Sequence, residues 1–465
     1  MVDVVENKAK FDDFRANYPV FSYDSYSWTL KGSLITLSFV FSYSTENTVT
    51  STIDINLPDS VSEDLIRINE DYIFRIGLIE SLSYWKAYCS PTFNIKCGKL
   101  TEYEINWWKN IWYRGTGEFR YLNGLLSVDQ NDWVEIICSL NIKKENIRHA
   151  FSSLKGNLVG FTGGKDSSLT LGILNDSAEE DNEIFMINPK SYIEDVLWAI
   201  RSHDIIRTTV IRNINPKLLL INEEGALNGH TPFSIVVAFI GLFTSSLRNK
   251  EYFIVSNEAS ANEPTVKGTD INHQYSKSFE FEKSLSEYLN TIWPDGPKYF
   301  SFLRPLTEVG IVSLLPRYDW MMRFISSCNK SSMKKLWCGE CPKCLFAFLM
   351  FSAVWDVKYA TRIIGVNMFY NRGNMETLLE LTGLKNTKPF DCVGTTGECL
   401  AALSEIYKRP DSLNEQLLAE FYNAHKDIIP VSGTYYKYMC EFNENLLPPE
   451  FLEIIKKAQK IICHE

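Results

Sequence analysis

The stretch Leu158-Val-Gly-Phe-Thr-Gly-Gly-Lys-Asp-Ser-Ser168 indicates the fold class of this 465-residue chain. Its apolar start, residues 158–161, predicts a buried strand, and the residues that follow the turn predict a helix. Between them, Gly163 and Gly164 allow a tight turn that points backbone N–H groups and a helix N-terminus at one place. Such a place binds phosphate, so the sequence predicts a nucleotide site. The lysine is followed by Asp166 instead of Ser or Thr, which excludes a Walker A loop.

The order Thr-Gly-Gly-Lys-Asp-Ser over residues 162–167 resembles the Ser-Gly-Gly-x-Asp-Ser loop of the PP-loop ATP pyrophosphatases. Enzymes of that superfamily split ATP between its α and β phosphates and transfer AMP to a carboxylate or a similar oxygen. Thr162 keeps the hydroxyl of the usual serine. The alternative is a glycine turn that only joins a strand to a helix.

Strand and helix patterns alternate after residue 157, as in a parallel sheet wrapped by helices. We therefore predict an α/β fold with a parallel-sheet PP-loop core, an N-terminal α+β domain and a zinc-clamped helical C-terminal region. The predicted domains are 1–150 for substrate binding, 151–350 for ATP binding and 351–465, which is mostly helical. The predicted strands are 157–161, 183–187, 207–212 and 251–256, and the predicted helices are 167–176, 192–204 and 232–248.

The composition limits the partners and the compartment. The formal net charge of -10 argues against nucleic acid, which usually needs a basic field. The longest apolar run, residues 232–247, is shorter than the roughly 20 residues of a membrane helix. The N-terminus has no apolar signal-peptide core, so we expect a cytoplasmic protein without membrane contact. The sequence leaves the oligomeric state open.

Four cysteines form the second signal. Cys338-Gly-Glu-Cys341-Pro-Lys-Cys344 places three thiols at two-residue gaps, and Cys328 can complete a tetrahedron. Four thiolates favour zinc, which would then be structural because no coordination position stays open. An iron–sulfur cluster is the rival interpretation, although a ferredoxin-like fourth cysteine is absent and Phe348 stands at its place.

Polar loops after the predicted strands supply candidate catalytic groups. His230 lies just before a predicted helix N-terminus, which lowers the pKa of a histidine and keeps it neutral. Glu258 or Glu263, in the polar loop after an apolar strand, could hold magnesium or act as a base. Lys277 could neutralise phosphate. Arg304 could bind a carboxylate or phosphate by two parallel hydrogen bonds, or equally make a structural ion pair.

The ordered set of motifs resembles one family, the ATP-dependent UDP-N-acetylmuramoyl-L-alanyl-L-glutamate epimerases, called MurL. The resemblance runs from about residue 70 to 400, and the two ends match only loosely. The motifs are Ser-Tyr-Trp-Lys-Ala (83–87), the loop 162–167, Leu-Asn-Gly-His (227–230), Ser-Asn-Glu (256–258), Asn-His-Gln-Tyr-Ser-Lys (272–277), Leu-Arg-Pro-Leu (303–306), Trp-Cys-Gly-Glu-Cys-Pro-Lys-Cys (337–344) and Lys-Pro-Phe-Asp-Cys-Val-Gly (388–394).

The resemblance implies a reaction in peptidoglycan precursor synthesis. AMP transfer from ATP to the glutamate carboxylate of UDP-MurNAc-L-Ala-L-Glu makes the neighbouring C–H acidic enough for an ordinary base. Re-protonation from the other face then gives D-Glu, and water releases AMP. We expect Asp166 to hold Mg²⁺, Asn188 to lie near adenine, and His230, Glu258, His273 and Lys277 to form the proton-transfer pool. The pyrophosphate would be held by Thr162, Gly163, Gly164, Lys165 and Ser167.

Three other functions fit part of this pattern. An enzyme similar to 7-cyano-7-deazaguanine synthase would also join such a loop to a four-cysteine zinc site, but would add ammonia to the activated carboxylate. That family has far shorter chains and no counterpart to residues 1–150. The intact Gly-Gly-Lys-Asp-Ser argues against the second alternative, a regulatory protein with a degenerate nucleotide site. An epimerase of another peptide is the nearest alternative.

Overall fold

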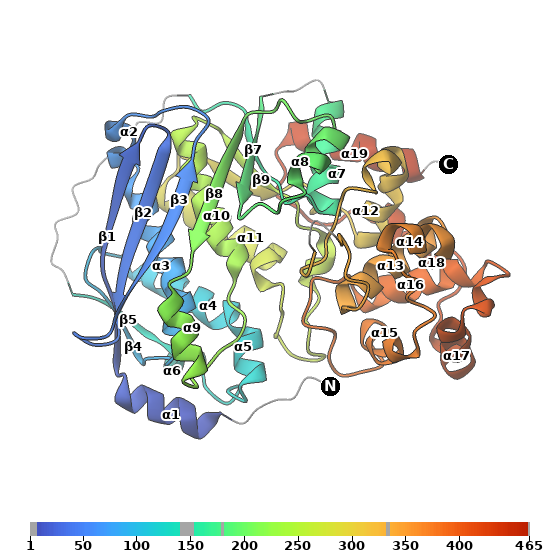
Figure 1. Cartoon of the computed structure of the whole chain (residues 1–465), viewed down its shortest axis with the longest axis horizontal. Coiled ribbons are helices and arrows are strands. Elements are labelled where there is room, and N and C mark those ends of the chain that lie inside the picture. The colour runs from blue at the N-terminus through green and yellow to red at the C-terminus, as the bar shows by residue number, and fades with distance from the viewer. Residues whose placement is uncertain (1–6, 140–152, 178–180, 332–334, 464–465) are drawn as a thin grey trace.

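The computed structural model describes residues 7–139, 153–177, 181–331 and 335–463. Within them one ten-stranded sheet has the order β10-β9-β6-β7-β8-β3-β2-β1-β4-β5 (Figure 1). The strands are β1 Val20–Lys31, β2 Leu34–Ser42, β3 Thr48–Asn56, β4 Thr92–Ile95, β5 Glu135–Cys138, β6 Asn157–Gly160, β7 Asn182–Ile187, β8 Arg207–Asn213, β9 Tyr252–Val255 and β10 Lys298–Ser301.

The sheet is mostly parallel. Strands β6 to β10 pair in parallel with one another, and β1, β4 and β5 form a second parallel group. Antiparallel pairing of β1 with β2, β2 with β3 and β3 with β8 joins the two groups. All four strands predicted after residue 157 are confirmed. The N-terminal strands therefore continue the sheet of the predicted core, while the division of the chain at residues 150 and 350 stays a prediction.

Helices cover the sheet and make up the C-terminal region, as predicted. The helix predicted over 192–204 ends at Ala199, because Arg201 has a left-handed φ of 53°. The helices are α1 Lys8–Asn17, α2 Glu63–Ile68, α3 Glu70–Trp85, α4 Glu102–Gly115, α5 Gly117–Leu122, α6 Gln130–Trp133, α7 Lys165–Asp176, α8 Ile193–Ala199, α9 Pro216–Glu223, α10 Phe233–Leu247, α11 Phe279–Ile292, α12 Glu308–Leu314, α13 Pro342–Val354, α14 Val357–Ile364, α15 Met375–Leu381, α16 Thr396–Tyr407, α17 Gln416–His425, α18 Thr434–Cys440 and α19 Pro449–Cys463.

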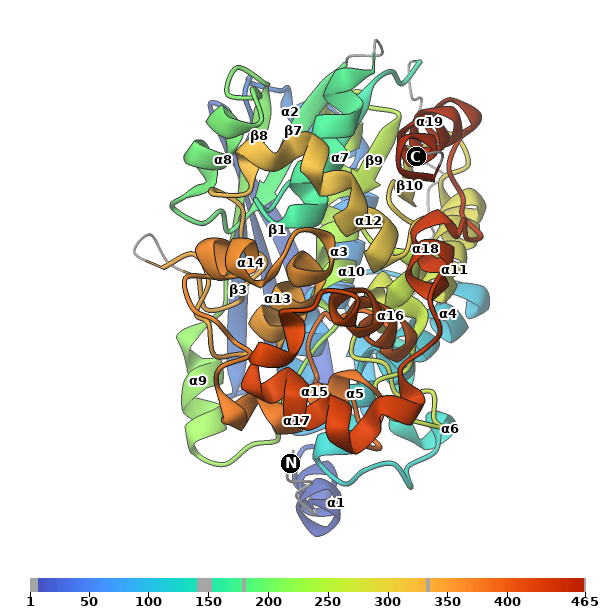
Figure 2. The same ribbon diagram turned by 90° about the vertical axis from the view of Figure 1, so that its right-hand side faces the viewer.

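The parallel half of the sheet separates two hydrophobic cores. Successive side chains of a strand point to opposite faces, so Leu158 and Phe253 join the core that contains α3 and α10. Their neighbours Val159 and Ile254 join the other core, with α7, α12 and α13. The C-terminal helices α13 to α18 lie on the right-hand side of the molecule in Figure 1, and this side faces the viewer in Figure 2. Both faces of β6 and β9 are thus buried, which leaves the strand ends for a site.

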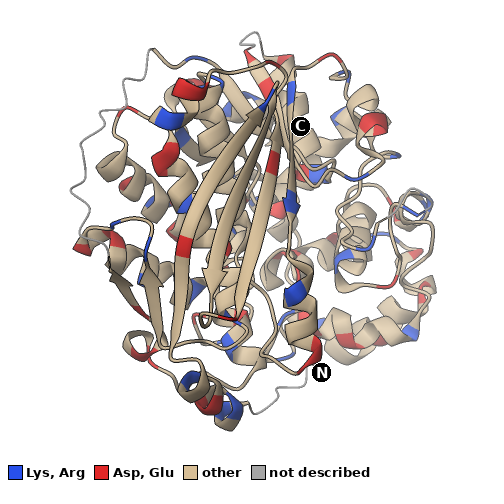
Figure 3. Ribbon diagram, turned by 60° about the vertical axis from the view of Figure 1, so that its left-hand side comes forward, with Lys and Arg blue, Asp and Glu red and all other residues tan. Residues whose placement is uncertain are grey.

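The N-terminal half of the sheet has one open face. Along β2, residues Ile35, Leu37, Phe39 and Phe41 are buried and the residues between them are partly exposed. Figure 3 looks onto strands β1 to β3, which no helix covers from that side.

No helix of the described residues is long and apolar enough to cross a membrane.

Helix α10 approaches β9 closely enough to require glycine. A Cβ at Gly241 would lie 2.2 Å from the ring of Phe253, and that ring is confined by Phe185, with ring centroids 5.3 Å apart. We expect Gly241→Ala to lower the free energy of unfolding by about 1–3 kcal/mol through overpacking. Urea denaturation measures this change. Gly117→Ala is the matched control, because a Cβ there makes ordinary contacts of 3.7 Å or more; equal stability of all three proteins would contradict the packing.

Candidate active site

The loop between β6 and α7 has the predicted form of a strand, a glycine turn and a helix N-terminus. Gly163 has a φ of 70°, and a Cβ there would lie 2.8 Å from Ile193 Cδ1. Gly164 is the N-cap residue of α7. The Thr162 N–H donates to Ser167 Oγ at 3.2 Å, and the two hydroxyls lie 3.2 Å apart. The turn is thus held by its own hydroxyls and opens toward the helix N-terminus.

A cavity of about 450 Å³ lies at the carboxyl ends of β6, β7 and β9. Its volume is in the range of roughly 300–1,000 Å³ that is typical of small-molecule sites. One part is apolar and suits a flat ring, with Phe185, Ile187, Phe233, Val237 and Val255. The predicted nucleotide residues that line the cavity are Thr162, Gly164, Asp166, Ser167 and Asn188, joined by Lys190, Lys277 and Lys343.

Lys165 does not line this cavity. Its side chain is buried, and its ammonium group donates to both carboxylate oxygens of Glu308 at 2.7 and 2.9 Å and to Asp166. Burial lowers the pKa of Lys165, but the charges of Asp166 and Glu308 outweigh it and raise the pKa above its usual value. The lysine therefore neutralises carboxylates in this structure.

Asp166, Glu258 and Glu308 form a group of three carboxylates that could hold a metal ion, with one oxygen of each within 4.8 Å of the others. Burial, together with Asp166 and Glu258, raises the pKa of Glu308 to about 8 against the opposing charge of Lys165. Burial and Asp166 also raise the pKa of Glu258. A hard cation such as Mg²⁺ prefers oxygen ligands and would relieve this repulsion, so the donor set fits the ion.

Glu118, His230 and His273 come together from three separate segments. The Nδ1 atoms of His273 and His230 lie 2.5 and 3.9 Å from Glu118 Oε2, and the ring centroids are 4.5 Å apart. Burial, and then the charge of His273, lowers the pKa of His230 to about 4. Burial lowers the pKa of His273 too, but hydrogen bonds to Cys392 and Glu118 outweigh it and raise it to about 9. At neutral pH the ring of His230 is therefore neutral and the ring of His273 is charged. The largest cause of the low pKa of His230 is burial, whereas the sequence predicted that a helix N-terminus would lower it.

Arg304 is fully buried and makes the structural ion pair that the sequence allowed as an alternative. Its Nε donates to Glu282 Oε2 at 2.8 Å. Its two remaining nitrogens donate to the carbonyl oxygens of Glu258 and Lys277, each at 2.5 Å. In this arrangement the guanidinium fixes the two loops that carry these residues.

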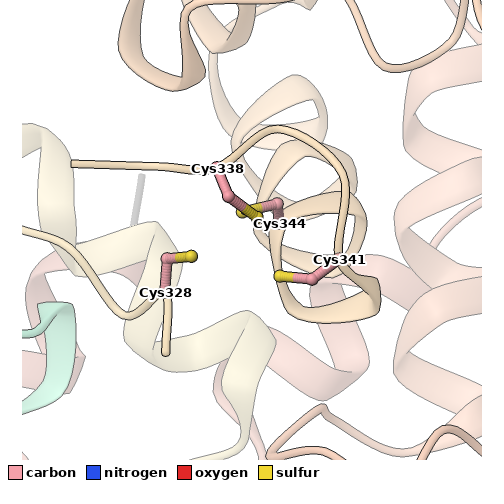
Figure 4. A group of neighbouring side chains, drawn as sticks. All are labelled: Cys328, Cys338, Cys341 and Cys344. Carbon is pink, nitrogen blue, oxygen red and sulfur yellow. The ribbon is translucent and has the colours of Figure 1, made fainter. Parts of the chain in front are cut away.

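Cys328, Cys338, Cys341 and Cys344 converge as predicted (Figure 4). Their sulfur atoms lie within 4.8 Å of one another, and those of Cys338 and Cys344 are 3.6 Å apart. Tetrahedral zinc with Zn–S bonds of about 2.3 Å places its sulfurs about 3.8 Å apart, so the donor set fits zinc. Cys341 is also the N-cap residue of α13, where a helix dipole favours negative charge.

The cysteine cluster is tied to the phosphate loop. The Ser326 N–H donates to the carbonyl oxygen of Gly163 at 3.1 Å, and Ser327 Oγ accepts from the Lys165 N–H at 3.3 Å. The next residue, Cys328, lines the large cavity. A metal in the cluster would therefore hold the segment 326–328 against the loop.

Sequence reasoning missed several groups of the site. Cys392 stood in the quoted motif 388–394 but was given no role, Lys343 stood inside the cysteine motif, and Glu308 follows just after the motif 303–306. Glu118 had no local signal, because only the fold places α5 beside His230. Lys86 donates to Asn228 Oδ1 at 2.8 Å, and burial lowers its pKa to about 8.

Two family models match this chain. The MurL N-terminal domain matches residues 13–302, and the MurL C-terminal domain matches residues 324–433. The chain therefore belongs to the MurL family, as the motif order predicted.

Three relatives carry the name UDP-N-acetyl-alpha-D-muramoyl-L-alanyl-L-glutamate epimerase. The protein of Salinispora tropica is 34% identical over 248 residues, 52% of this chain and 53% of its own length. That of a Micromonospora species is 33% identical over 252 residues, 52% and 55% of the two chains. That of Xanthomonas oryzae pv. oryzae is 27% identical over 393 residues, 82% and 84% of the two chains. The match thus spans about half the length of the first two relatives and most of the third.

The cysteine cluster predicts about one zinc per chain in the purified protein. We expect Cys341→Ser to lose this zinc and to melt at a lower temperature, because three thiolates and a hydroxyl bind zinc weakly. Elemental analysis and thermal melting measure both effects. Cys138→Ser, in β5, is the control that keeps metal and stability. Iron in place of zinc, or a full zinc content in Cys341→Ser, would contradict the assignment.

Proposed function

We propose that this chain catalyses the ATP-dependent epimerisation of the terminal L-Glu of UDP-MurNAc-L-Ala-L-Glu to D-Glu, with AMP and pyrophosphate as products. The names of the relatives support the substrate. The observation that carries the proposal is the adjacency of two groups. Asp166 and Lys277 line a nucleotide-sized cavity, and the histidine pair adjoins Lys277 through the contact of His273 with Cys392.

ATP would occupy the 450 Å³ cavity, with its phosphates at the loop between β6 and α7. The backbone N–H groups around Gly164 and the hydroxyls of Thr162 and Ser167 face the phosphates, and the apolar part near Asn188 takes the adenine. Lys277 and Lys343 line the same cavity and offset the phosphate charge. Mg²⁺ held by Asp166, Glu258 and Glu308 would supply stabilisation of the charge that develops on the leaving pyrophosphate.

Adenylation solves the main difficulty of the reaction. A C–H bond beside a carboxylate is a very weak acid, because its carbanion would stand next to a negative charge. Transfer of AMP cancels that charge and leaves an electron-withdrawing mixed anhydride. A general base then contributes typically about 10²–10⁴-fold, and fixed positive groups such as Lys277 stabilise the enolate.

The proton-transfer pool is His230, Glu258, His273 and Lys277. A neutral His230 can accept a proton and a charged His273 can donate one. Glu118 of α5 positions the pair, and Lys86 of the segment after α3 lies beside Asn228. Both come from the first 150 residues, which supports the proposal that this part of the chain contributes to binding the large substrate.

The test is a single incubation of purified protein with ATP, Mg²⁺ and UDP-MurNAc-L-Ala-L-Glu in deuterated water. We expect D-Glu in the product, one deuterium at its Cα, and AMP formed only when the peptide is present. Chiral analysis after hydrolysis and mass spectrometry measure these. Ammonia incorporation without Cα exchange would instead indicate a carboxylate-amidating enzyme, and AMP formation with a different dipeptide only would indicate another substrate.

Asp166→Asn tests the proposed metal and phosphate site. We expect peptide-dependent AMP formation to fall by about 10²-fold or more, because the amide removes one charge from the carboxylate group. Pyrophosphate release measures the rate over a range of Mg²⁺ concentrations. Asp195→Asn, at an exposed position of α8, is the control and keeps the wild-type rate. A wild-type rate and Mg²⁺ dependence in Asp166→Asn would remove Asp166 from the metal site.

A further inference from the structure

Cys392 lies in a small cavity that adjoins the nucleotide cavity. This second cavity has a volume of about 40 Å³, and Cys392 lines it together with Glu258 and Glu308. Four residues line both cavities: Asp166, Lys277, Ser327 and Lys343. The thiol is half-buried and comes from the segment 388–394. The thiol therefore lies beside the part of the nucleotide cavity that Asp166, Lys277, Ser327 and Lys343 line.

Positive groups surround this thiol. The ammonium group of Lys277 donates to Cys392 Sγ at 3.1 Å. The ring of His273 is hydrogen-bonded to the same thiol, and Lys343 adds a further positive charge. Burial raises the pKa of Cys392, but Lys277, Lys343 and His273 together lower it well below the usual value. Cys392 in turn is the main cause of the raised pKa of Lys277.

Other cysteines of the chain lack these surroundings. Burial raises the pKa of Cys89, Cys97, Cys138 and Cys399. Cys440 and Cys463 are bonded to each other. Among the described cysteines outside the four-cysteine cluster, only Cys392 thus has neighbours that stabilise a thiolate. A thiolate at neutral pH is a base and a nucleophile, whereas a buried thiol is inert.

We propose that Cys392 is a catalytic residue that removes the α-proton of the adenylated glutamyl residue; this inference rests on the proposed epimerase function. The thiolate forms an S–H bond as the Cα–H bond breaks, and the electron pair moves onto the carbonyl oxygen of the mixed anhydride as an enolate. Lys277 lies within hydrogen-bond distance of the sulfur. Its ammonium group therefore stabilises the thiolate before the proton transfer and the enolate after it. A second acid returns a proton to the opposite face of the carbon, and water then cleaves the anhydride to carboxylate and AMP.

The decisive experiment compares Cys392→Ser and Cys392→Ala with wild type in the deuterated-water incubation. We expect Cα deuteration to fall by about 10²-fold or more, because a general base of this kind contributes about 10²–10⁴-fold. Peptide-dependent pyrophosphate release should remain of the same order, so the variants form AMP without inversion. Cys138→Ser, remote from both cavities, keeps both rates. Thermal melting of all four proteins separates loss of the base from loss of the fold.

A second measurement depends on neither ATP nor peptide. The ultraviolet absorbance of wild type minus that of Cys392→Ser should show one thiolate per chain at neutral pH, where an ordinary thiol with a pKa of about 8.5 is almost fully protonated. Wild-type Cα deuteration in both Cys392 variants, or no thiolate difference, overturns the role of Cys392 and leaves the epimerase proposal intact. Absence of peptide-dependent AMP formation and Cα exchange in the wild-type protein overturns both.

Discussion

The buried guanidinium of Arg304 fixes the two loops that carry Glu258 and Lys277. Arg304 has no exposed surface, and its charge is balanced by Glu282, which also accepts from the Ser301 N–H at 3.0 Å. Its other nitrogens hold the carbonyl oxygens of Glu258 and Lys277. An unpaired buried arginine would cost several kcal/mol, so this geometry is strongly imposed. Two loops that have little regular structure of their own therefore present a carboxylate and an ammonium group at fixed positions.

The second constraint is the alternation of buried charges. Lys165 lies between Asp166 and Glu308, and Lys277 lies near Cys392 and Glu258. Each cation lowers the cost of burying the anions beside it, yet burial, together with repulsion from Asp166 and Glu258, still raises the pKa of Glu308 to about 8. The site is therefore poised to accept a divalent cation among the carboxylates, while the lysines toward the large cavity suit an anion.

Sequence reasoning identified the local features and missed the long-range ones. The strand, the glycine turn and the helix over 157–176 are encoded by neighbouring residues, and so is the thiol spacing at 338–344. In contrast, Glu308 of α12 comes within 4.8 Å of Asp166 of α7 only through the tertiary fold. The antiparallel pairing of β3 with β8, which merges the N-terminal strands into the sheet, has no signature in either strand. For Arg304 the sequence allowed either a ligand for the substrate or a structural ion pair, and the structure shows the ion pair with Glu282 at a fully buried position.

The same charge balance explains why a thiol, and not another carboxylate, would serve as the base beside Lys277. A further carboxylate among Asp166, Glu258 and Glu308 would share their burial and their mutual repulsion and take up a proton near neutral pH, as the raised pKa of Glu308 indicates. The sulfur of Cys392 instead faces Lys277, Lys343 and the charged ring of His273. The negative charge of the thiolate is also spread over a larger atom than a carboxylate oxygen. Cations that bind phosphate in the large cavity also hold this thiolate in the small one. Activation of the carboxylate and removal of the neighbouring proton would then depend on one shared set of lysines, which ties the two steps to a single position of the substrate.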